Sequence, residues 1–237
     1  MQTENYIVMP DLLATTQQAL ESLDTLLEEA KGTVKSLVAK DGRISSSLME
    51  QHQAAAHGLS WLATYHESMR QMQNWATKLT EAGEFGEAEQ LLHQIACGEY
   101  HAQVVGGIPM SQGEIVRLSD IKISAATQQE YQNAAVMNLI ANGNTQTART
   151  RLVELMQEQA GNVIFGASGL DEELEMIREQ FRRFSIDRVE PHAHEWHLND
   201  ELIPMEIIEE LAELGVFGLT IPEELGGFGL TKASMAV

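Results

Sequence analysis

Cysteine is nearly absent from this chain of 237 residues, which limits what can hold the fold together. The single cysteine, Cys97, cannot form a disulfide within the chain. It lies in the apolar run Leu91–Cys97, where we expect a buried and unreactive thiol, because cysteine packs as a small hydrophobic side chain. A chain without disulfides is typical of a reducing compartment, and we expect a cytoplasmic protein.

Basic residues are also scarce, with 15 Lys and Arg against 35 Asp and Glu and a formal net charge of −20. Nucleic acids and anionic membrane surfaces are bound by basic patches, so the sequence predicts neither as a partner. No run approaches the roughly 20 apolar residues of a membrane-spanning helix, and residues 1–10 do not resemble a signal peptide. Aromatic residues make up only 5% of the chain, whereas 11 Met indicate adaptable aliphatic packing.

Helical periodicity is what the chain has in abundance, and it predicts an all-α fold class. Apolar residues recur at spacings of three, four or seven, and Ser, Thr and Gly stand where helices begin and end. Ser111 and Glu114 have the spacing of a capping box that would begin a short helix. The other predicted helices cover residues 11–40, 45–82, 86–105, 125–141 capped by Ser124, and 145–163. Short loops between them favour antiparallel neighbours in a helical bundle.

The histidines of this first part do not predict a metal site. His52 and His66 are 14 residues apart on one expected helix, which separates them by roughly 21 Å. We expect these residues, with His57, His93 and His101, to be hydrogen-bonded in the interior or exposed at the surface. No acid–base pair or activated nucleophile is predicted in residues 1–165.

A short uncharged segment, residues 166–169, is the predicted linker between two domains, because glycine, alanine and serine favour flexible connections. After it, Asp171 or Ser168 can cap a helix with Arg178, Arg182 and Arg183 in solvent. Pro191 should kink or end this helix. Its buried face is predicted to contain Leu170, Leu174, Ile177, Phe181 and Phe184.

Three histidines and a carboxylate in the stretch His192–His197 suggest zinc, but helix geometry argues against it. At 100° per residue, only His194 and His197 share a face, so we predict no metal. A later helix should begin at Pro204 and bury Ile207, Ile208, Leu211 and Leu214.

The stretch Leu219–Leu230 organises the end of the chain. Pro222 and the glycines at 226, 227 and 229 favour a tight surface turn, and a new helix is expected after it. The spacing is not that of a phosphate-binding glycine motif. Glu223 and Glu224 are predicted to be solvated.

Four motifs give residues 170–237 a resemblance to a known family. They are the helix Leu170–Phe184, the stretch Val189–Ala193, the stretch Leu211–Leu219 and the turn Ile221–Leu230. In this order they resemble the N-terminal helical domain of the acyl-CoA dehydrogenases. Residues 53–65 and 107–117 faintly resemble helices of the C-terminal domain in some of these enzymes. Residues 1–165 would then be a reworked helical copy; the alternative is a plain bundle for contacts between subunits.

The resemblance implies a flavoprotein that uses FAD to remove hydrogens from an acyl-CoA substrate and passes electrons to an electron-transferring flavoprotein. The added helical domain resembles the subfamily that acts on methylsuccinyl-CoA, a branched dicarboxylic thioester. The family's β-domain and C-terminal helical domain are missing from these residues, so we expect a piece of a longer homodimeric or homotetrameric protein. No catalytic, cofactor-binding or metal residue is therefore assigned in this segment.

The expected domains are an N-terminal helical extension (1–165), a linker (166–169) and an incomplete N-terminal dehydrogenase domain (170–237). Two other functions remain open. One is an acyl-CoA dehydrogenase or oxidase of the same fold with another substrate or acceptor. The other is a non-enzymatic helical interaction module. Alone, these residues are expected neither to hold flavin nor to turn over substrate.

Overall fold

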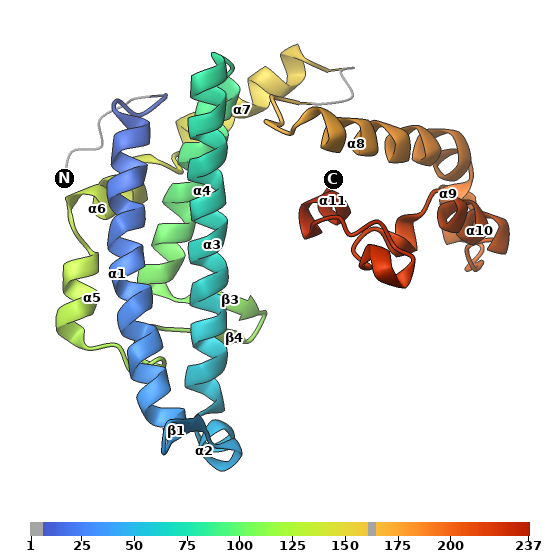
Figure 1. Cartoon of the computed structure of the whole chain (residues 1–237). Helices are drawn as coiled ribbons and strands as arrows, with labels where there is room; N and C mark the ends of the chain where they lie inside the picture. Colours follow the sequence, from blue (N-terminus) through green and yellow to red (C-terminus); the bar gives the residue numbers. More distant parts are fainter. Residues whose placement is uncertain (1–6, 161–164) are drawn as a thin grey trace. The chain divides into compact units, whose positions relative to one another are not determined.

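The computed structural model describes residues 7–160 and 165–237 (Figure 1). The chain divides into two compact units, which we call the bundle unit (residues 1–167) and the tail unit (residues 168–237). Within these residues nearly all regular structure is helical, and the strands form two short hairpins, so the predicted all-α class is confirmed. Within the described residues, no helix is both long enough and apolar enough to cross a membrane.

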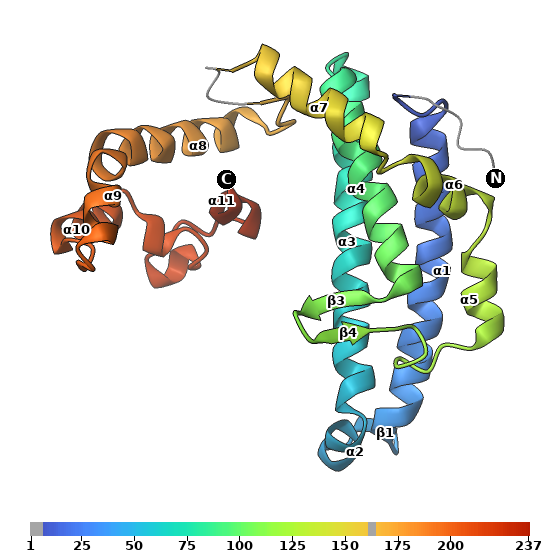
Figure 2. The same cartoon turned by 180° about the vertical axis from the view of Figure 1, so that it is seen from behind.

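Three long helices form the frame of the bundle unit: α1 (Leu12–Val38), α3 (Gln53–Ala82) and α4 (Glu87–Gly106). Helix α3 runs antiparallel to α1 and α4, and the shorter α6 (Ala134–Asn142) packs against both α1 and α4 (Figure 1). The predicted helical bundle is thus confirmed. Its closing elements are the short α5 (Ala125–Tyr131) beside α1 and α7 (Gln146–Glu158) on α4 (Figure 2).

Helix α1 shows how the core follows from the sequence. Leu20, Leu23, Leu27, Ala30 and Val34 recur every three or four residues and are all buried against the other helices. Each fully buried leucine contributes roughly 2 kcal/mol relative to an exposed one, which favours this face over any other. The helix ends where Ala39 adopts an extended conformation, one or two residues before the predicted stop.

The predicted second helix is divided in two. Ser45 caps it as predicted by accepting from the Leu48 amide, but α2 (Ser46–Gln51) ends at His52, and α3 then begins at Gln53. His52 lies outside the helical region, with φ −113° and ψ 23°. Apolar spacing alone did not indicate this break.

The predicted capping box at Ser111 and Glu114 is wrong. These residues close an antiparallel hairpin of β3 (Ile108–Ser111) and β4 (Glu114–Val116), in which they face each other across a two-residue turn (Figure 2). The hairpin forms in place of the predicted helix because Ile108 and Val116 pair in register and both side chains are buried in the core. A second small hairpin, β1 (Ala39–Lys40) with β2 (Arg43–Ile44), joins α1 to α2.

The predicted helix over 125–141 is also two helices. Ser124 caps α5 as predicted, with 3.1 Å from the Thr127 amide nitrogen to Oγ. The Asn133 side chain then accepts from the amides of Ala135 and Val136 and begins α6, which explains the break. Thr145 caps α7, but the helix ends at Glu158 rather than 163. The predicted end of this helix, residue 163, is one of residues 161–164, which lie outside the described residues.

Helices α4 and α6 approach closely at two glycines. A Cβ on Gly98 would lie 2.8 Å from the Leu139 carbonyl oxygen and 3.1 Å from the Gly143 Cα. A Cβ on Gly143 would lie 2.6 Å from the Gln94 carbonyl oxygen. Backbone atoms cannot yield as a flexible side chain can, so this crossing requires glycine on both sides.

The predicted linker is more ordered at its beginning than its composition suggests. The Ala167 amide donates to the buried carboxylate of Glu89 at 2.7 Å, and the Ala167 carbonyl accepts from the indole of Trp75 at 3.2 Å. The segment therefore leaves the bundle unit along a fixed path. Two side chains that are distant in sequence determine that path.

The tail unit begins with α8 (Glu172–Phe184), which Asp171 caps by accepting from the Leu174 amide, as predicted. A π-helical turn (Ser185–Val189) joins it to α9 (Glu190–Leu198), so of the two predicted alternatives, a kink or an end, Pro191 does not end the helix. Proline has no backbone N–H to donate, and the wider π-helical turn accommodates the helical hydrogen bond that is therefore missing. The chain then forms α10 (Met205–Glu213), two 3₁₀ turns (Val216–Gly218 and Glu223–Leu225) and α11 (Lys232–Ala236).

The predicted buried faces of the tail unit are largely wrong. No residue of α8 is buried, and Leu174, Ile177, Phe181 and Phe184 are only half-buried. On α10, Ile207 is buried, whereas Ile208, Leu211 and Leu214 are half-buried. The apolar stripes exist, but the tail unit offers too little packing surface to cover them.

Candidate functional site

The turn that follows α10 has a fixed geometry. Gly215 ends α10 with φ 81°, a left-handed conformation that favours glycine. The two arms of the loop pair through backbone hydrogen bonds from Phe228 to Gly218 and from Leu230 to Leu219, at 2.9 and 2.8 Å. A Cβ on Gly227 would lie 2.2 Å from the Ile221 carbonyl oxygen, so a larger residue cannot fit there. The glycines in this stretch thus serve the backbone of the turn.

Large apolar side chains are exposed over much of the tail unit, which has few buried residues. Leu202 is 91% exposed, and Leu225 and Leu198 are 74% and 69% exposed. The remaining exposed large side chains of this unit are Met176, Ile186, Ile203, Met205, Phe217, Ile221, Phe228 and Met235. Ile207 and Leu219 are its buried hydrophobic residues. Extended exposed apolar surface of this kind marks a region that packs against other protein.

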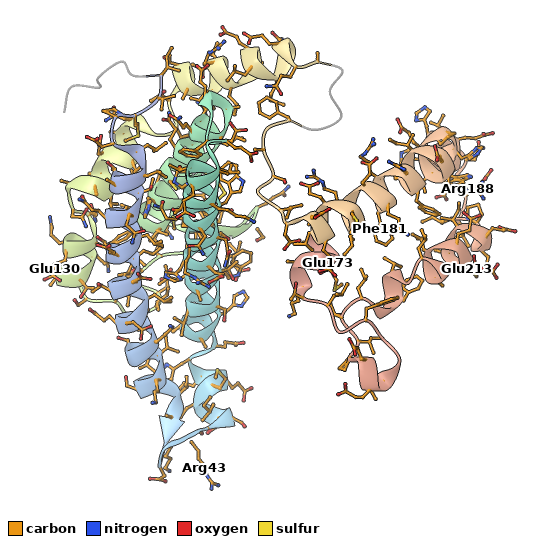
Figure 3. All side chains as sticks on the ribbon, turned by 45° about the horizontal axis from the view of Figure 1, so that its top comes forward. Arg43, Glu130, Glu173, Phe181, Arg188 and Glu213 are labelled. Carbon is orange, nitrogen blue, oxygen red and sulfur yellow. The ribbon has the colours of Figure 1, made fainter. Side chains whose placement is uncertain are left out.

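Charged residues of the tail unit are paired with one another. Glu179 accepts from Arg182 at 2.7 Å and from Arg183 at 2.8 Å, and these hydrogen bonds lower the pKa of Glu179 to about 2. Arg178 pairs with Glu175. Arg188, which is labelled in Figure 3, lies on the π-helical turn and pairs with Glu210 on α10. The arginines of α8 lie at the surface, as predicted, and each also pairs with a glutamate of the same helix. These pairs explain the charges without an anion ligand.

A hollow of about 660 Å³ lies along α8, and its chemistry tests whether this unit could hold a flavin nucleotide. Glu172, Glu175 and Glu179 line it, with one cation, Arg183. Three carboxylates repel the diphosphate of such a cofactor. This hollow therefore does not fit FAD by itself.

The histidines of α9 are exposed and do not converge. His192 stacks on Trp196 with ring centroids 5.7 Å apart, while His194 and His197 are exposed. Across the described residues, no group of three His, Cys, Asp or Glu side chains could hold a metal ion. Glu223 and Glu224 are exposed on a 3₁₀ turn, where we expected solvated carboxylates.

A buried polar cluster in the bundle unit was not predicted from the sequence. His93 Nε2 lies 3.1 Å from Thr16 Oγ1 and 3.2 Å from Gln73 Oε1, and the Thr16 hydroxyl donates to Gln73 Oε1 at 2.6 Å. Burial lowers the pKa of His93 to about 4 and raises that of the neighbouring Cys97 thiol to about 12. An uncharged imidazole beside a protonated thiol is not an activated nucleophile. The cluster therefore links α1, α3 and α4 and carries no chemistry.

Three other histidines of the bundle unit are also hydrogen-bonded, as predicted. His101 Nδ1 and the Tyr131 hydroxyl share a buried hydrogen bond of 2.6 Å, and burial lowers the pKa of His101 to about 4. His66 bonds Asp24, and His57 accepts from the indole of Trp61 at 3.2 Å. Thus His57, His66, His93 and His101 have separate hydrogen-bond partners and are not brought together.

A comparison with models of known protein families finds a match to the tail unit. Residues 171–237 match the family model "Acyl-CoA dehydrogenase, N-terminal domain". Residues 171–237 are therefore similar to this domain, which confirms the resemblance inferred for residues 170–237.

Individual relatives narrow the comparison. The chain is 59% identical over 230 residues to the (2S)-methylsuccinyl-CoA dehydrogenase of Cereibacter sphaeroides, covering 97% of this chain and 41% of that protein. It is 34% identical over 67 residues to the glutaryl-CoA dehydrogenase of Desulfococcus multivorans, covering 28% of this chain and 17% of that protein. It is 41% identical over 68 residues to the benzylmalonyl-CoA dehydrogenase of Aromatoleum aromaticum, covering 29% of this chain and 18% of that protein. The chain thus spans less than half the length of each of these relatives.

Proposed function

We propose that this chain is the N-terminal part of a flavin-dependent acyl-CoA dehydrogenase that oxidises (2S)-methylsuccinyl-CoA to mesaconyl-CoA. The observation that carries the proposal is the extent of the match to the Cereibacter sphaeroides enzyme. That match covers 97% of the chain and so includes the bundle unit, whereas the other two relatives described cover 28% and 29%. The bundle unit is therefore the part of the sequence that favours this substrate over others in the family.

The proposed domain organisation is an N-terminal extension over 1–165, a connection at 166–169 and the start of the dehydrogenase domain over 170–237. The division of the chain between Ala167 and Ser168 supports this assignment. The family match from residue 171 onward supports it independently.

Exposed apolar side chains of the tail unit support the proposal that more protein completes this domain. Leu198, Leu202 and Leu225 are all more than two-thirds exposed, which is costly for side chains of this size in water. We propose that the remaining domains of the dehydrogenase cover them. The half-buried stripe of α8 would then become a true core face.

In the whole enzyme, bound FAD supplies the redox chemistry by accepting the hydrogen that leaves the β carbon of the thioester. We propose that the flavin is held mainly by parts outside these residues, since the acidic hollow on α8 does not fit it. A glutamate base and the hydrogen bonds to the thioester oxygen would also come from those parts. No residue of this chain is assigned a catalytic role.

For partners, we propose an electron-transferring flavoprotein as acceptor and a homodimer or homotetramer as the assembly. We propose a cytoplasmic location, supported by the buried and unpaired Cys97 thiol. These statements follow from the family and from the proposed reaction.

The proposal is tested with the full-length protein and with methylsuccinyl-CoA, succinyl-CoA and butyryl-CoA as substrates. Each is assayed with an artificial electron acceptor under nitrogen and, separately, with oxygen alone. Preference for methylsuccinyl-CoA with dependence on the added acceptor supports the proposal. Preference for another thioester overturns the substrate assignment, and equal turnover with oxygen alone identifies an oxidase.

A further inference from the structure

An apolar groove of about 890 Å³ lies at one end of the bundle unit, apart from the residues that the proposed dehydrogenase function involves. Helices α1, α2 and α3 form its walls, with contributions from β2 and from Glu114 at the start of β4. Val34, Val38, Met49 and Leu59 supply its apolar lining. A volume near this value is typical of pockets for small molecules, which combine an apolar lining with a few polar groups.

Two lysines and one acid, Glu114, are the fully charged residues that line the groove. Lys31 and Lys35 both line it and lie four residues apart on α1, so they share one helix face. Lys31 Nζ lies 2.7 Å from Glu28 Oε1, on exposed surface where such a pair is weak. Lys35 forms no ion pair within the part of the chain that the structure describes. Long lysine stems can cover apolar surface while the ammonium groups stay at the rim.

This end of the bundle is unusual within an acidic protein. Residues 31–43 contain four basic residues, Lys31, Lys35, Lys40 and Arg43, and one acid, Asp41, in a chain of net charge −20. Arg43 lies at the tip of the β1–β2 hairpin that closes this end (Figure 3). With Lys31 and Lys35 against Glu114, the residues that line the groove carry a small net positive charge in a protein that is acidic as a whole.

We propose that the groove binds an amphipathic carboxylate, with its aliphatic chain on the apolar lining and its carboxylate at Lys31 and Lys35. The 70% exposed side chain of Ile44 belongs to the same lining and would be covered by the bound chain. A cation with the same aliphatic chain would place its charge against the two ammonium groups. An anion without the chain would leave the apolar lining exposed. Both halves of the ligand are thus required.

Isothermal titration calorimetry on the 237-residue chain tests the site with decanoate. Decyltrimethylammonium is the cation with the same chain, and acetate is the anion without it. The expected result is saturable binding of one decanoate per chain, at least about tenfold tighter than the cation, and no binding of acetate. Comparable affinity for decanoate and the cation would contradict the proposal. Binding to anionic phospholipid vesicles without binding of decanoate would contradict it as well.

Substitutions localise the binding. The double variant Lys31→Gln/Lys35→Gln should weaken decanoate binding at least about fivefold, while Lys232→Gln, which removes one positive charge from a residue that does not line the groove, should not change it. Ala54→Trp fills the groove from an exposed position of α3 and should abolish binding with unchanged helicity. Retention of wild-type affinity in both the double lysine variant and Ala54→Trp would overturn the assignment.

Discussion

The indole of Trp75 donates a hydrogen bond to the carbonyl oxygen of Ala167 at 3.2 Å, and it joins residues 92 positions apart in the sequence. Trp75 also packs edge-on against Phe85, with ring centroids 6.1 Å apart. The carboxylate of Glu89 accepts a hydrogen bond from the backbone amide of the same Ala167. Together these contacts attach the end of the bundle unit to α3 and α4.

Trp75→Phe should therefore destabilise the bundle unit through the lost hydrogen bond alone. Phenylalanine keeps the aromatic packing but cannot donate, which costs about 1 kcal/mol in the free energy of unfolding. Urea unfolding followed by circular dichroism measures the change. Trp61→Phe, which removes an exposed hydrogen bond to His57, is the matched control and should cost less than about 0.5 kcal/mol. Equal effects of the two substitutions would contradict this assignment.

Substitution by alanine should have opposite effects on stability at two helical glycines, because only one of them packs closely between α4 and α6. Gly98→Ala places a methyl group against backbone atoms of α6 and should cost about 2 kcal/mol or more. Gly32→Ala on α1 meets nothing within 4 Å and should stabilise the chain by about 0.5 to 1 kcal/mol, because alanine favours a helix. Thermal unfolding of both variants decides the matter. Stabilisation by both would show that the two helices do not approach at Gly98.

Buried histidines predict that the bundle unit loses stability in mild acid. Burial lowers the pKa of His93 and of His101 from the ordinary value of 6.5 to about 4, so the unfolded chain binds protons that the folded chain does not. The stabilisation is fully present above the unfolded pKa and is lost as the pH falls from 6.5 towards 4.

His93→Gln should reduce that loss. Between pH of about 7 and about 4.5, its free energy of unfolding should fall by about 2 kcal/mol less than that of the wild type. Urea titrations at both pH values supply the comparison. His192→Gln, on the exposed surface of α9, is the control and should follow the wild type. A slope for His93→Gln identical to the wild type would mean that His93 is charged in the folded chain.

Leu202 tests whether the exposed surface of the tail unit is an interface. Because the side chain is 91% exposed, Leu202→Asn should change the stability of the isolated chain by less than about 0.5 kcal/mol and should lower its binding of an apolar dye. In the full-length protein the same substitution should lower the thermal midpoint, because other domains would cover Leu202. Leu219→Asn, at a buried position, should destabilise both forms. An unchanged midpoint of full-length Leu202→Asn would exclude this residue from the interface.

Local sequence chemistry predicted most of the helices and their caps. Ser45, Ser124, Thr145 and Asp171 each accept the backbone hydrogen bond expected of them, because a cap depends only on residues within one turn. The pairing of Ser111 with Glu114 shows the limit of this reasoning. The same spacing closes a hairpin once Ile108 and Val116 can be buried together, and that depends on distant helices.

Tertiary contacts account for what the sequence could not predict. Thr16, Gln73 and His93 come from three helices, and no spacing in the sequence indicates that they meet. The apolar stripe of α8 was recognised from its periodicity, but periodicity cannot tell whether a partner covers it. The resemblance of the tail unit to a known family was recognisable because four motifs occur in order in residues 170–237, and the family match confirms this resemblance from residue 171 onward.

The most direct test of the account is the reduction of flavin in the full-length protein under exclusion of oxygen. We predict a yellow protein with one flavin per chain, whose visible absorption is bleached by methylsuccinyl-CoA and far less by succinyl-CoA, while residues 1–237 alone are colourless. A colourless full-length protein, or a flavin that methylsuccinyl-CoA does not bleach, would contradict the proposed function.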